Sequence, residues 1–417
     1  MRKVVFLFLC CLCIACDSGN SPSLSPTTPS TNIKVQPGSS NSQTSSASVN
    51  PLKSPNTCGN PNDWIPDDEA LQKCLDRGGR IELEAGTPGY IVNGLNGDPT
   101  RGLWLTRPGT VLTSRGGRAR IIAGRDLFTR ILQTQPQVDI NNFSVENVSF
   151  DGMVDTMMPD GLYRRRIGDC TADDHPGNLA FQGYDFQIIN NESQHAMCGG
   201  SLGLIGRFTV RGNYIAHNGR DKFSGGPWSD GITILSCKDS VVTNNTLVDN
   251  TDIQLALGGG HGCIVADNTI VSAGKLAFAG LNIGNFGSGD HSGSEYRNNI
   301  ISANPGMMYI GLLVGSHPWD TSVWVYNAGK VIGNTSSGSD LNLGVDGVLG
   351  GEITGNIVHD PHREVNDPCN LTAHNYTVFP PHVTGTTLQG GWEVERLDAN
   401  LWCSSEKVSS QDRRRLF

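Results

Sequence analysis

Two aspartates, Asp230 and Asp252, are the residues of this sequence whose type and spacing best suit acid–base chemistry. They lie 22 residues apart, in the segments SDGI (229–232) and TDIQLAL (251–257). If these segments begin neighbouring parallel strands, ~4.8 Å apart, the two carboxylates can lie on one face. Crowding raises the pKa of one carboxylate, so that an acid and a base coexist at neutral pH. Hydrolysis of a glycosidic bond requires such a pair.

Further polar and aromatic residues surround the two aspartates. A tryptophan can stack on a sugar ring, a glutamine on the face of Asp252 can hydrogen-bond hydroxyl groups, and histidine or lysine can supply a base. We therefore expect a substrate-binding set made of Trp228, Gln254, His261, Lys222, Asp221 and His217. The alternative is that the aspartates cap turns. Strict alternation from Ile232 turns Asp230 inward, so an outward Asp230 requires a break at Gly231.

Two other classes of function remain open. A polysaccharide lyase or uronate epimerase needs carboxylates that hold calcium beside an Arg or Lys base, or a His/Tyr pair. Arg220-Asp221-Lys222 is the tight cluster of that kind. Calcium would be the cofactor of this class, whereas for a hydrolase we expect no cofactor and no metal. The third class is a non-catalytic glycan-binding or adhesin solenoid, which predicts no convergent titratable groups.

The elements that would position these residues are short β-branched runs, each with an asparagine. The asparagines are Asn147, Asn213, Asn245, Asn268, Asn299, Asn334 and Asn356, with spacings of 66, 32, 23, 31, 35 and 22. A period near 22 residues with tight turns predicts a parallel β-helix, in which equivalent residues stack along the axis. An asparagine in a turn tolerates left-handed dihedrals and can hydrogen-bond its own copy one coil on. We expect Asn245 and Asn268 to stack on neighbouring coils, and the first spacing to contain three coils.

The start of the body supports the same architecture. Residues 67–75 read D-x-x-A-L-Q-x-x-L, and a Gly-Gly pair with an I-x-L strand follows in residues 78–86. This order resembles the opening of the pectate-lyase-like superfamily, which includes polygalacturonases and phage tailspikes. The resemblance implies an all-β fold, a single-stranded right-handed parallel β-helix whose N-terminal helix caps the first coil. Strands should run from about Ile81 to Val358, with long insertions at Asp290-His291 and His317 that build groove walls.

The region of the two aspartates resembles the polygalacturonase family in part. In that family an Asp-Gly-Ile strand start is followed about one coil later by an Asp-Asp-Cys strand start. The resemblance implies catalytic roles for Asp230 and Asp252. The sequence departs from the family pattern where Ile253 replaces the second Asp of the pair. It also lacks a histidine near residues 278–280, and its Gly-His-Gly at 260–262 comes too early.

The N-terminal segment indicates the compartment. Arg2 and Lys3 precede an apolar run that ends at Cys16, and this resembles a bacterial lipoprotein signal (residues 1–16) with Cys16 as the lipidated residue. An ordinary cleaved signal peptide is the alternative. Residues 17–57 are rich in Ser, Thr and Pro and predict a disordered tether. Residues 58–417 would form one β-helix domain with a C-terminal extension after about 360. We expect a lipid-anchored protein of the bacterial cell envelope, periplasmic or on the cell surface.

Cysteine count and charge limit the partners. Twelve cysteines are present and four lie in the signal region. The even remainder predicts disulfides in an exported protein, in sequence-local couples. The expected couples are Cys58–Cys74, Cys170–Cys198, Cys237–Cys263 and Cys369–Cys403. The formal net charge of −9 argues against nucleic acid. The expected partners are a polysaccharide and, through the lipid anchor, a membrane, and we expect a monomer.

Overall fold

The computed structural model describes residues 57–136, 138–154, 177–220, 228–317, 322–362, 374–378 and 382–388. The predicted signal peptide and nearly all of the tether lie outside these ranges. So do six residues of the predicted sites and disulfides, namely Cys16, Cys170, Asp221, Lys222, Cys369 and Cys403. None of the helices in the described ranges combines the length and the apolar character needed to cross a membrane.

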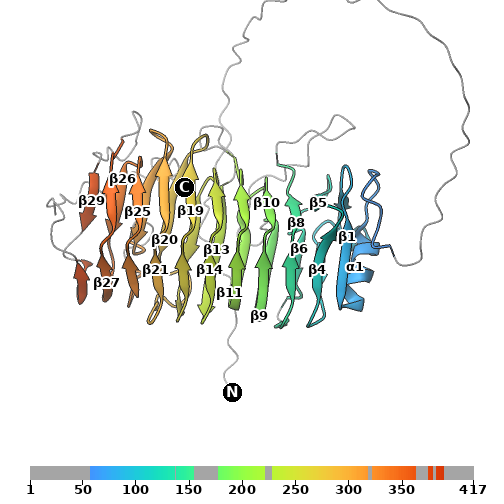
Figure 1. The fold of residues 1–417 in the computed structure, drawn as a ribbon, viewed down its shortest axis with the longest axis horizontal. Coiled ribbons are helices and arrows are strands. Elements are labelled where there is room, and N and C mark those ends of the chain that lie inside the picture. The colour runs from blue at the N-terminus through green and yellow to red at the C-terminus, as the bar shows by residue number, and fades with distance from the viewer. Residues whose placement is uncertain are drawn as a thin grey trace, which may run out of the picture.

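The described chain winds into a stack of coils with three strand-bearing faces, and its strands pair in parallel (Figure 1). Going once around a coil, the chain passes a strand of the first face, one of the second and one of the third. Crossovers between parallel strands are almost always right-handed, the hand that the resemblance implied. The predicted parallel β-helix is therefore confirmed.

The first face contains β3 (Leu103–Leu105), β6 (Leu132–Thr134), β9 (Leu179–Ile189), β11 (Gly199–Arg211), β13 (Ser229–Lys238), β16 (Ile253–Leu257), β20 (Ala277–Ile283), β23 (Met308–Val314), β26 (Leu341–Val345) and β29 (His374–Val378). A short strand, β17 (Gly260–His261), pairs with the end of β13. Strands β9 and β11 are long enough to continue into the second face.

The second face contains β1 (Arg80–Glu84), β4 (Val111–Arg115), β7 (Ser144–Glu146), β14 (Val241–Thr243), β18 (Ile264–Ala266), β21 (Glu295–Arg297), β24 (Lys330–Ile332), β27 (Gly351–Thr354) and β30 (Thr386–Leu388). The third face contains β2 (Tyr90–Val92), β5 (Ala119–Ala123), β8 (Val148–Asp151), β10 (Glu192–Gln194), β12 (Tyr214–Ala216), β15 (Thr246–Val248), β19 (Thr269–Ser272), β22 (Ile300–Ala303), β25 (Thr335–Ser337) and β28 (Ile357–His359). Because β29 and β30 pair with β26 and β27, the stack continues past the expected end at Val358.

An asparagine ladder runs inside the turn between the second and third faces. Its members are Asn191, Asn213, Asn245, Asn268, Asn299, Asn334 and Asn356. Each side-chain amide donates to the Oδ1 atom of the next asparagine, as from Asn245 to Asn268 at 2.9 Å. The same Oδ1 also accepts the backbone N–H of the previous asparagine, at 3.0 Å in that pair. The buried side-chain amides of the ladder thus satisfy one another from coil to coil.

The structure corrects one member of the predicted ladder. Asn147 has a left-handed backbone with φ 56°, and Val148, the next residue, holds the ladder position, where its N–H donates to Asn191 Oδ1 at 3.0 Å. The left-handed residue and the ladder residue are therefore neighbours rather than one residue, as Asn244 (φ 55°) and Asn245 also show. Because Asn191 intervenes, the spacing of 66 contains two coils, not three.

Columns of aliphatic side chains fill the interior. One column, on five successive coils of the first face, consists of Ile232, Leu255, Leu281, Leu312 and Leu343, all fully buried. Each such side chain contributes ~1.5–3 kcal/mol through its burial. The column keeps neighbouring strand starts in register, and this register positions the two aspartates.

The predicted capping helix is present as α1 (Asp68–Arg77), which lies over the first coil and buries Leu71 and Leu75 (Figure 1). A 3-10 turn, η1 (Leu95–Gly97), follows β2. Asp67, which stands at the N-cap position of α1, makes no cap hydrogen bond. Its carboxylate accepts the N–H of Ile91 at 3.1 Å, while Asp68 accepts those of Asn93 and Gly94 at 2.8 and 2.7 Å. The acidic residues therefore join the helix to the first coil.

Two of the predicted disulfides are confirmed. Cys58 bonds Cys74, and Cys237 bonds Cys263, with Cα atoms 5.7 and 6.3 Å apart. Cys198 is also disulfide-bonded. The first bond fixes the segment before α1, and the second joins two consecutive coils.

Candidate active site

Asp230 points outward because alternation breaks at Gly231. On the strands stacked one after another beyond β13, the residues at the level of Asp230 are Ile253, Ala279, Ile310 and Leu341. These residues belong to a separate apolar cluster outside the main core. The residues one position further along these strands, such as Gln254, face inward. The residues two positions further, which begin with Ile232, face inward as well. A Cβ on Gly231 would lie 2.3 Å from the carbonyl oxygen of Gln254, so this position accommodates only glycine. The break that an outward Asp230 requires is therefore present.

The carboxylate of Asp230 lies against the strand start of the next coil. Its Oδ1 accepts the N–H of Ile253 at 3.1 Å, and its Oδ2 accepts the hydroxyl of Thr233 at 2.6 Å. Asp252 immediately precedes Ile253, so the structure brings the two aspartates together. Each residue is partly exposed as a whole, while its carboxyl group is desolvated by burial.

Burial and mutual repulsion shift both carboxyl groups. Burial raises the pKa of Asp230 to about 6, against the lowering effect of its two hydrogen bonds. Burial and the charge of Asp230 raise the pKa of Asp252 well above its ordinary value. The described residues donate no hydrogen bond to the Asp252 carboxylate, so nothing among them offsets these two effects. When the pair holds a single proton, that proton therefore resides on Asp252.

Aromatic residues lie near the pair on the same coil and on the next one. The N–H of Phe278 donates to the backbone oxygen of Asp252 at 2.8 Å, which places Phe278 one coil on from Asp252. Its ring is partly exposed and meets the Tyr309 ring of the following coil edge-on, with centroids 6.3 Å apart. Trp228, also partly exposed, directly precedes the strand that carries Asp230. Phe278 stands where the polygalacturonase pattern places a histidine, and motif matching alone therefore missed it.

Gln254 lies in the interior of the coil and not in the substrate groove that the sequence predicted. Gln254 is fully buried. Its Oε1 accepts the side-chain amide of Asn250 at 2.5 Å, and its Nε2 donates to Ser272 Oγ at 2.8 Å. Alternation counted from Asp252 fails because the break turns this level inward. With its amide bonded to neighbours inside the coil, Gln254 is not available to a substrate.

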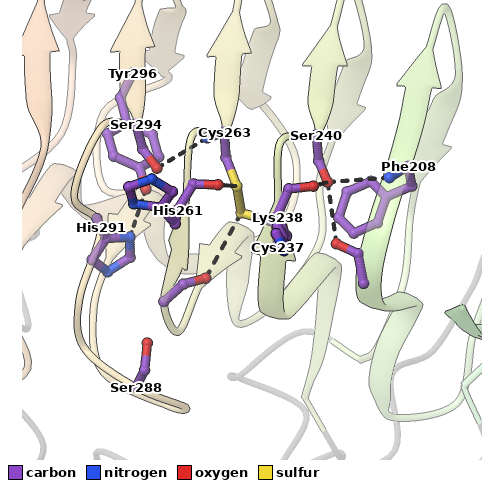
Figure 2. The surroundings of a disulfide bond; sticks show 12 residues. Phe208, Cys237, Lys238, Ser240, His261, Cys263, Ser288, His291, Ser294 and Tyr296 are labelled. Atoms are coloured by element: carbon purple, nitrogen blue, oxygen red, sulfur yellow. Dashed lines mark hydrogen bonds between the residues drawn. A yellow bond between two sulfur atoms is a disulfide. The ribbon is translucent and has the colours of Figure 1, made fainter. Parts of the chain in front are cut away.

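His261 is exposed but lies far from the aspartates. It pairs with Lys238 at the opposite end of β13, eight residues from Asp230, or roughly 25 Å along the strand. Figure 2 shows it beside the Cys237–Cys263 disulfide. His291, expected in a groove wall, is instead buried nearby. Its Nε2 lies 2.8 Å from the oxygen of Gly284, its Nδ1 lies 2.5 Å from the Tyr296 hydroxyl, and burial lowers its pKa to about 4.

His217 belongs to a polar group that we call the histidine row, made of Arg120, Asp151, His195, His217 and Asp249. Asp151 accepts from Arg120 at 2.6 Å, and its other oxygen lies 3.1 Å from His195 Nδ1. The rings of His195 and His217 stack with centroids 6.1 Å apart, and His217 Nδ1 lies 3.8 Å from Asp249. Burial alone would raise the pKa of Asp151, but His195 and Arg120 hold it below its ordinary value. Burial lowers the pKa of His217.

The histidine row and the aspartate pair lie near the same corner of the solenoid, where the third face leads into the first face. Asp249 precedes Asp252 by three residues, so their Cα atoms lie within ~11 Å. The sequence carried a signal for the row, because His195, His217 and Asp249 each stand four residues after a ladder asparagine. Of the predicted Arg220-Asp221-Lys222 cluster only Arg220 is described, in the same turn and partly exposed.

Comparison with known proteins finds likeness only among solved structures. No family model and no curated protein matches the chain. The A-module of the mannuronan C-5 epimerase AlgE4 of Azotobacter vinelandii is 16% identical over 81% of this chain and 97% of that chain, with a TM-score of 0.42. A DFA-IIIase of Arthrobacter chlorophenolicus A6 is 14% identical over 82% and 97%, with a TM-score of 0.46. The surface protein and adhesin PfbA of Streptococcus pneumoniae is 12% identical over 79% and 97%, with a TM-score of 0.40.

These likenesses concern the course of the chain. The fold follows from this chain's own strand pairing, and it is a parallel β-helix. On that fold, the described residues place two crowded carboxylates near partly exposed aromatic residues and near a row of histidines and carboxylates.

Proposed function

We propose that this chain is a carbohydrate-active enzyme of the bacterial envelope that hydrolyses glycosidic bonds in a polysaccharide. The observation that carries the proposal is the unequal pair of carboxyl groups. Asp230 takes the negative charge because Thr233 and Ile253 donate hydrogen bonds to it. Asp252 keeps the proton because burial and the neighbouring charge disfavour its ionised form.

The two roles follow from this asymmetry. Asp252 donates its proton to the oxygen of the leaving sugar, and Asp230, with a pKa of about 6, is ionised at pH 7 and activates water. Trp228 and Phe278 are partly exposed aromatic residues near the pair, which suits the apolar faces of sugar rings. In this proposal the lipid at Cys16 and the tether keep the enzyme close to its large substrate.

The test uses the full chain with Asp230→Asn and Asp252→Asn variants on a panel of polysaccharides. Asparagine keeps the shape but does not titrate. General acid–base catalysis contributes ~10²–10⁴-fold, so each variant should lose about that factor in kcat on an identified substrate. New reducing ends measure hydrolysis, and absorbance of unsaturated uronates measures elimination.

Asp267→Asn is the matched control. Asp267 is exposed, has φ 56° and lies in a turn of the same solenoid, where asparagine is equally suited. It should leave turnover unchanged. Full activity in both active-site variants would refute the assignment of the pair.

Lyase or epimerase chemistry is the second candidate, and the histidine row favours it. His195 and His217 are partly exposed imidazoles, and Arg120 supplies positive charge nearby. These are the groups that abstract a proton beside a uronate. Products that absorb as unsaturated uronates would replace hydrolysis with this mechanism and move the catalytic roles to the row.

A further inference from the structure

Three side chains from different coils converge near the C-terminal end of the described stack. They are His317, after β23, Asp346, after β26, and His382, after β29. The Nδ1 atoms of the two histidines lie 3.1 Å apart. Asp346 Oδ1 lies 3.1 Å from the first and 2.9 Å from the second. His317 and Asp346 are buried, and His382 is about one-third exposed.

Hydrogen bonds to an ionised Asp346 do not account for this triangle. If both Nδ1 atoms carry hydrogens for the ionised carboxylate, two N–H groups face each other at 3.1 Å. If either carries a lone pair, that lone pair faces the carboxylate oxygen. A cation between the three atoms removes the conflict, because all three lone pairs can then point toward it.

The dimensions fit a small transition-metal ion. A tetrahedral ion with ligands at ~2.1 Å holds its ligand atoms roughly 3.4 Å apart, within a few tenths of an ångström of this triangle. Two imidazoles and one carboxylate suit zinc-class metals, whereas calcium and magnesium prefer oxygen ligands. Three protein ligands leave a fourth position for water or another group.

The surroundings are shaped to admit the first histidine. Gly347 has φ 78°, and a Cβ there would lie 2.3 Å from the ring of His317. Trp324 meets the ring of His317 edge-on, with centroids 4.4 Å apart, and that of His382 at 5.8 Å. The indole thus limits solvent access on one side of the cluster.

We propose that His317, Asp346 and His382 bind one divalent transition-metal ion of the zinc class. The ion ties together three successive coils. No short sequence motif marks this site, because its ligands stand 29 and 36 residues apart. The site is separate from the aspartate pair, since β23 lies three coils, or ~14 Å, along the axis from β13.

The test measures metal content and thermal unfolding of the full chain, loaded with Zn²⁺ and dialysed. We expect one zinc per chain, visible absorption of tetrahedral type after replacement by Co²⁺, and a lower Tm when a chelator is present. His382→Gln, the most exposed ligand and the least risk to folding, should weaken zinc binding at least tenfold and abolish the chelator effect on Tm.

His359→Gln is the control, because His359 also contacts a carboxylate, Asp360, at 2.7 Å but lies outside the cluster. It should bind zinc as the unaltered chain does. A substoichiometric zinc content with no chelator effect in the unaltered chain would overturn the proposal. So would full zinc binding in His382→Gln. Neither readout depends on a polysaccharide substrate.

Discussion

At the scale of single residues, the two aspartates differ because their surroundings differ. Asp230 reaches a hydroxyl and a backbone N–H, and Asp252 receives no hydrogen bond from the described residues. Burial therefore acts on two carboxyl groups that differ in the number of hydrogen bonds they accept. This difference separates the pKa values of the two groups, and with them the two proposed roles.

The raised pKa values predict how stability depends on pH. A carboxyl whose pKa is raised by folding adds stability below its unfolded pKa of ~3.9, and this stability is lost as pH rises through the folded pKa. For Asp230 the loss falls between about pH 4 and 6, and for Asp252 it extends higher. Asp252→Asn should therefore raise the free energy of unfolding at pH 8, and raise it much less at pH 4. Urea unfolding at both values measures this, and a larger gain at pH 4 would contradict it.

Residue-level prediction from sequence succeeded where spacing decided the outcome. The 22-residue interval was enough to pair Asp230 with Asp252. It failed for Gln254, because alternation was counted through the break at Gly231. His261 was predicted to bind substrate because it follows Asp252 closely in the sequence. In the structure the length of strand β13 separates it from the aspartate pair.

At the scale of elements, the ladder explains why the asparagine spacing was such a strong signal. Asn268 Nδ2 donates to Val242 O at 3.0 Å and to Asn299 Oδ1 at 2.9 Å, and Asn268 Oδ1 accepts two bonds from Asn245. No other small side chain meets all these requirements in a buried turn. The sequence did not reveal that Asn147 holds the left-handed position and Val148 the ladder position, because asparagine suits both positions.

Removing one ladder residue should be costly. Asn268→Ala leaves several buried polar groups without partners, at ~1–3 kcal/mol each before relaxation, so we expect a loss of about 3–5 kcal/mol in the free energy of unfolding. Asn244→Ala, at the adjacent left-handed position, should cost only ~1–2 kcal/mol. Equilibrium urea unfolding compares the two, and equal losses would count against the division of roles.

At the scale of the whole molecule, stability adds up from contacts between neighbouring coils. The sequence could predict this architecture because the repeat is local. It could not predict the triangle of His317, Asp346 and His382, since those residues meet only after three coils with insertions of different length have stacked.

The Cys237–Cys263 disulfide should stabilise this stack. It closes a loop of 26 residues, which corresponds to ~3.5 kcal/mol in the chain-entropy description. The double variant Cys237→Ser, Cys263→Ser should lower the unfolding free energy by about that amount. Urea unfolding measures the change, and titration of the unreduced protein with a thiol reagent should show no reactive thiol at either position. A variant as stable as the parent would show that the bond leaves the unfolded chain unconstrained.

The same disulfide has a mechanical consequence. Each coil is bonded only to the coils above and below it, so a pulling force on one end peels the solenoid coil by coil, and each released coil of 22 residues lengthens the chain by ~75 Å. The bond between Cys237 and Cys263 spans one complete turn of the helix. Under tension this covalent bond limits extension, because the residues between the two cysteines cannot add to the length of the stretched chain. The middle of the rod therefore keeps a shortened contour even when every hydrogen bond around it has broken.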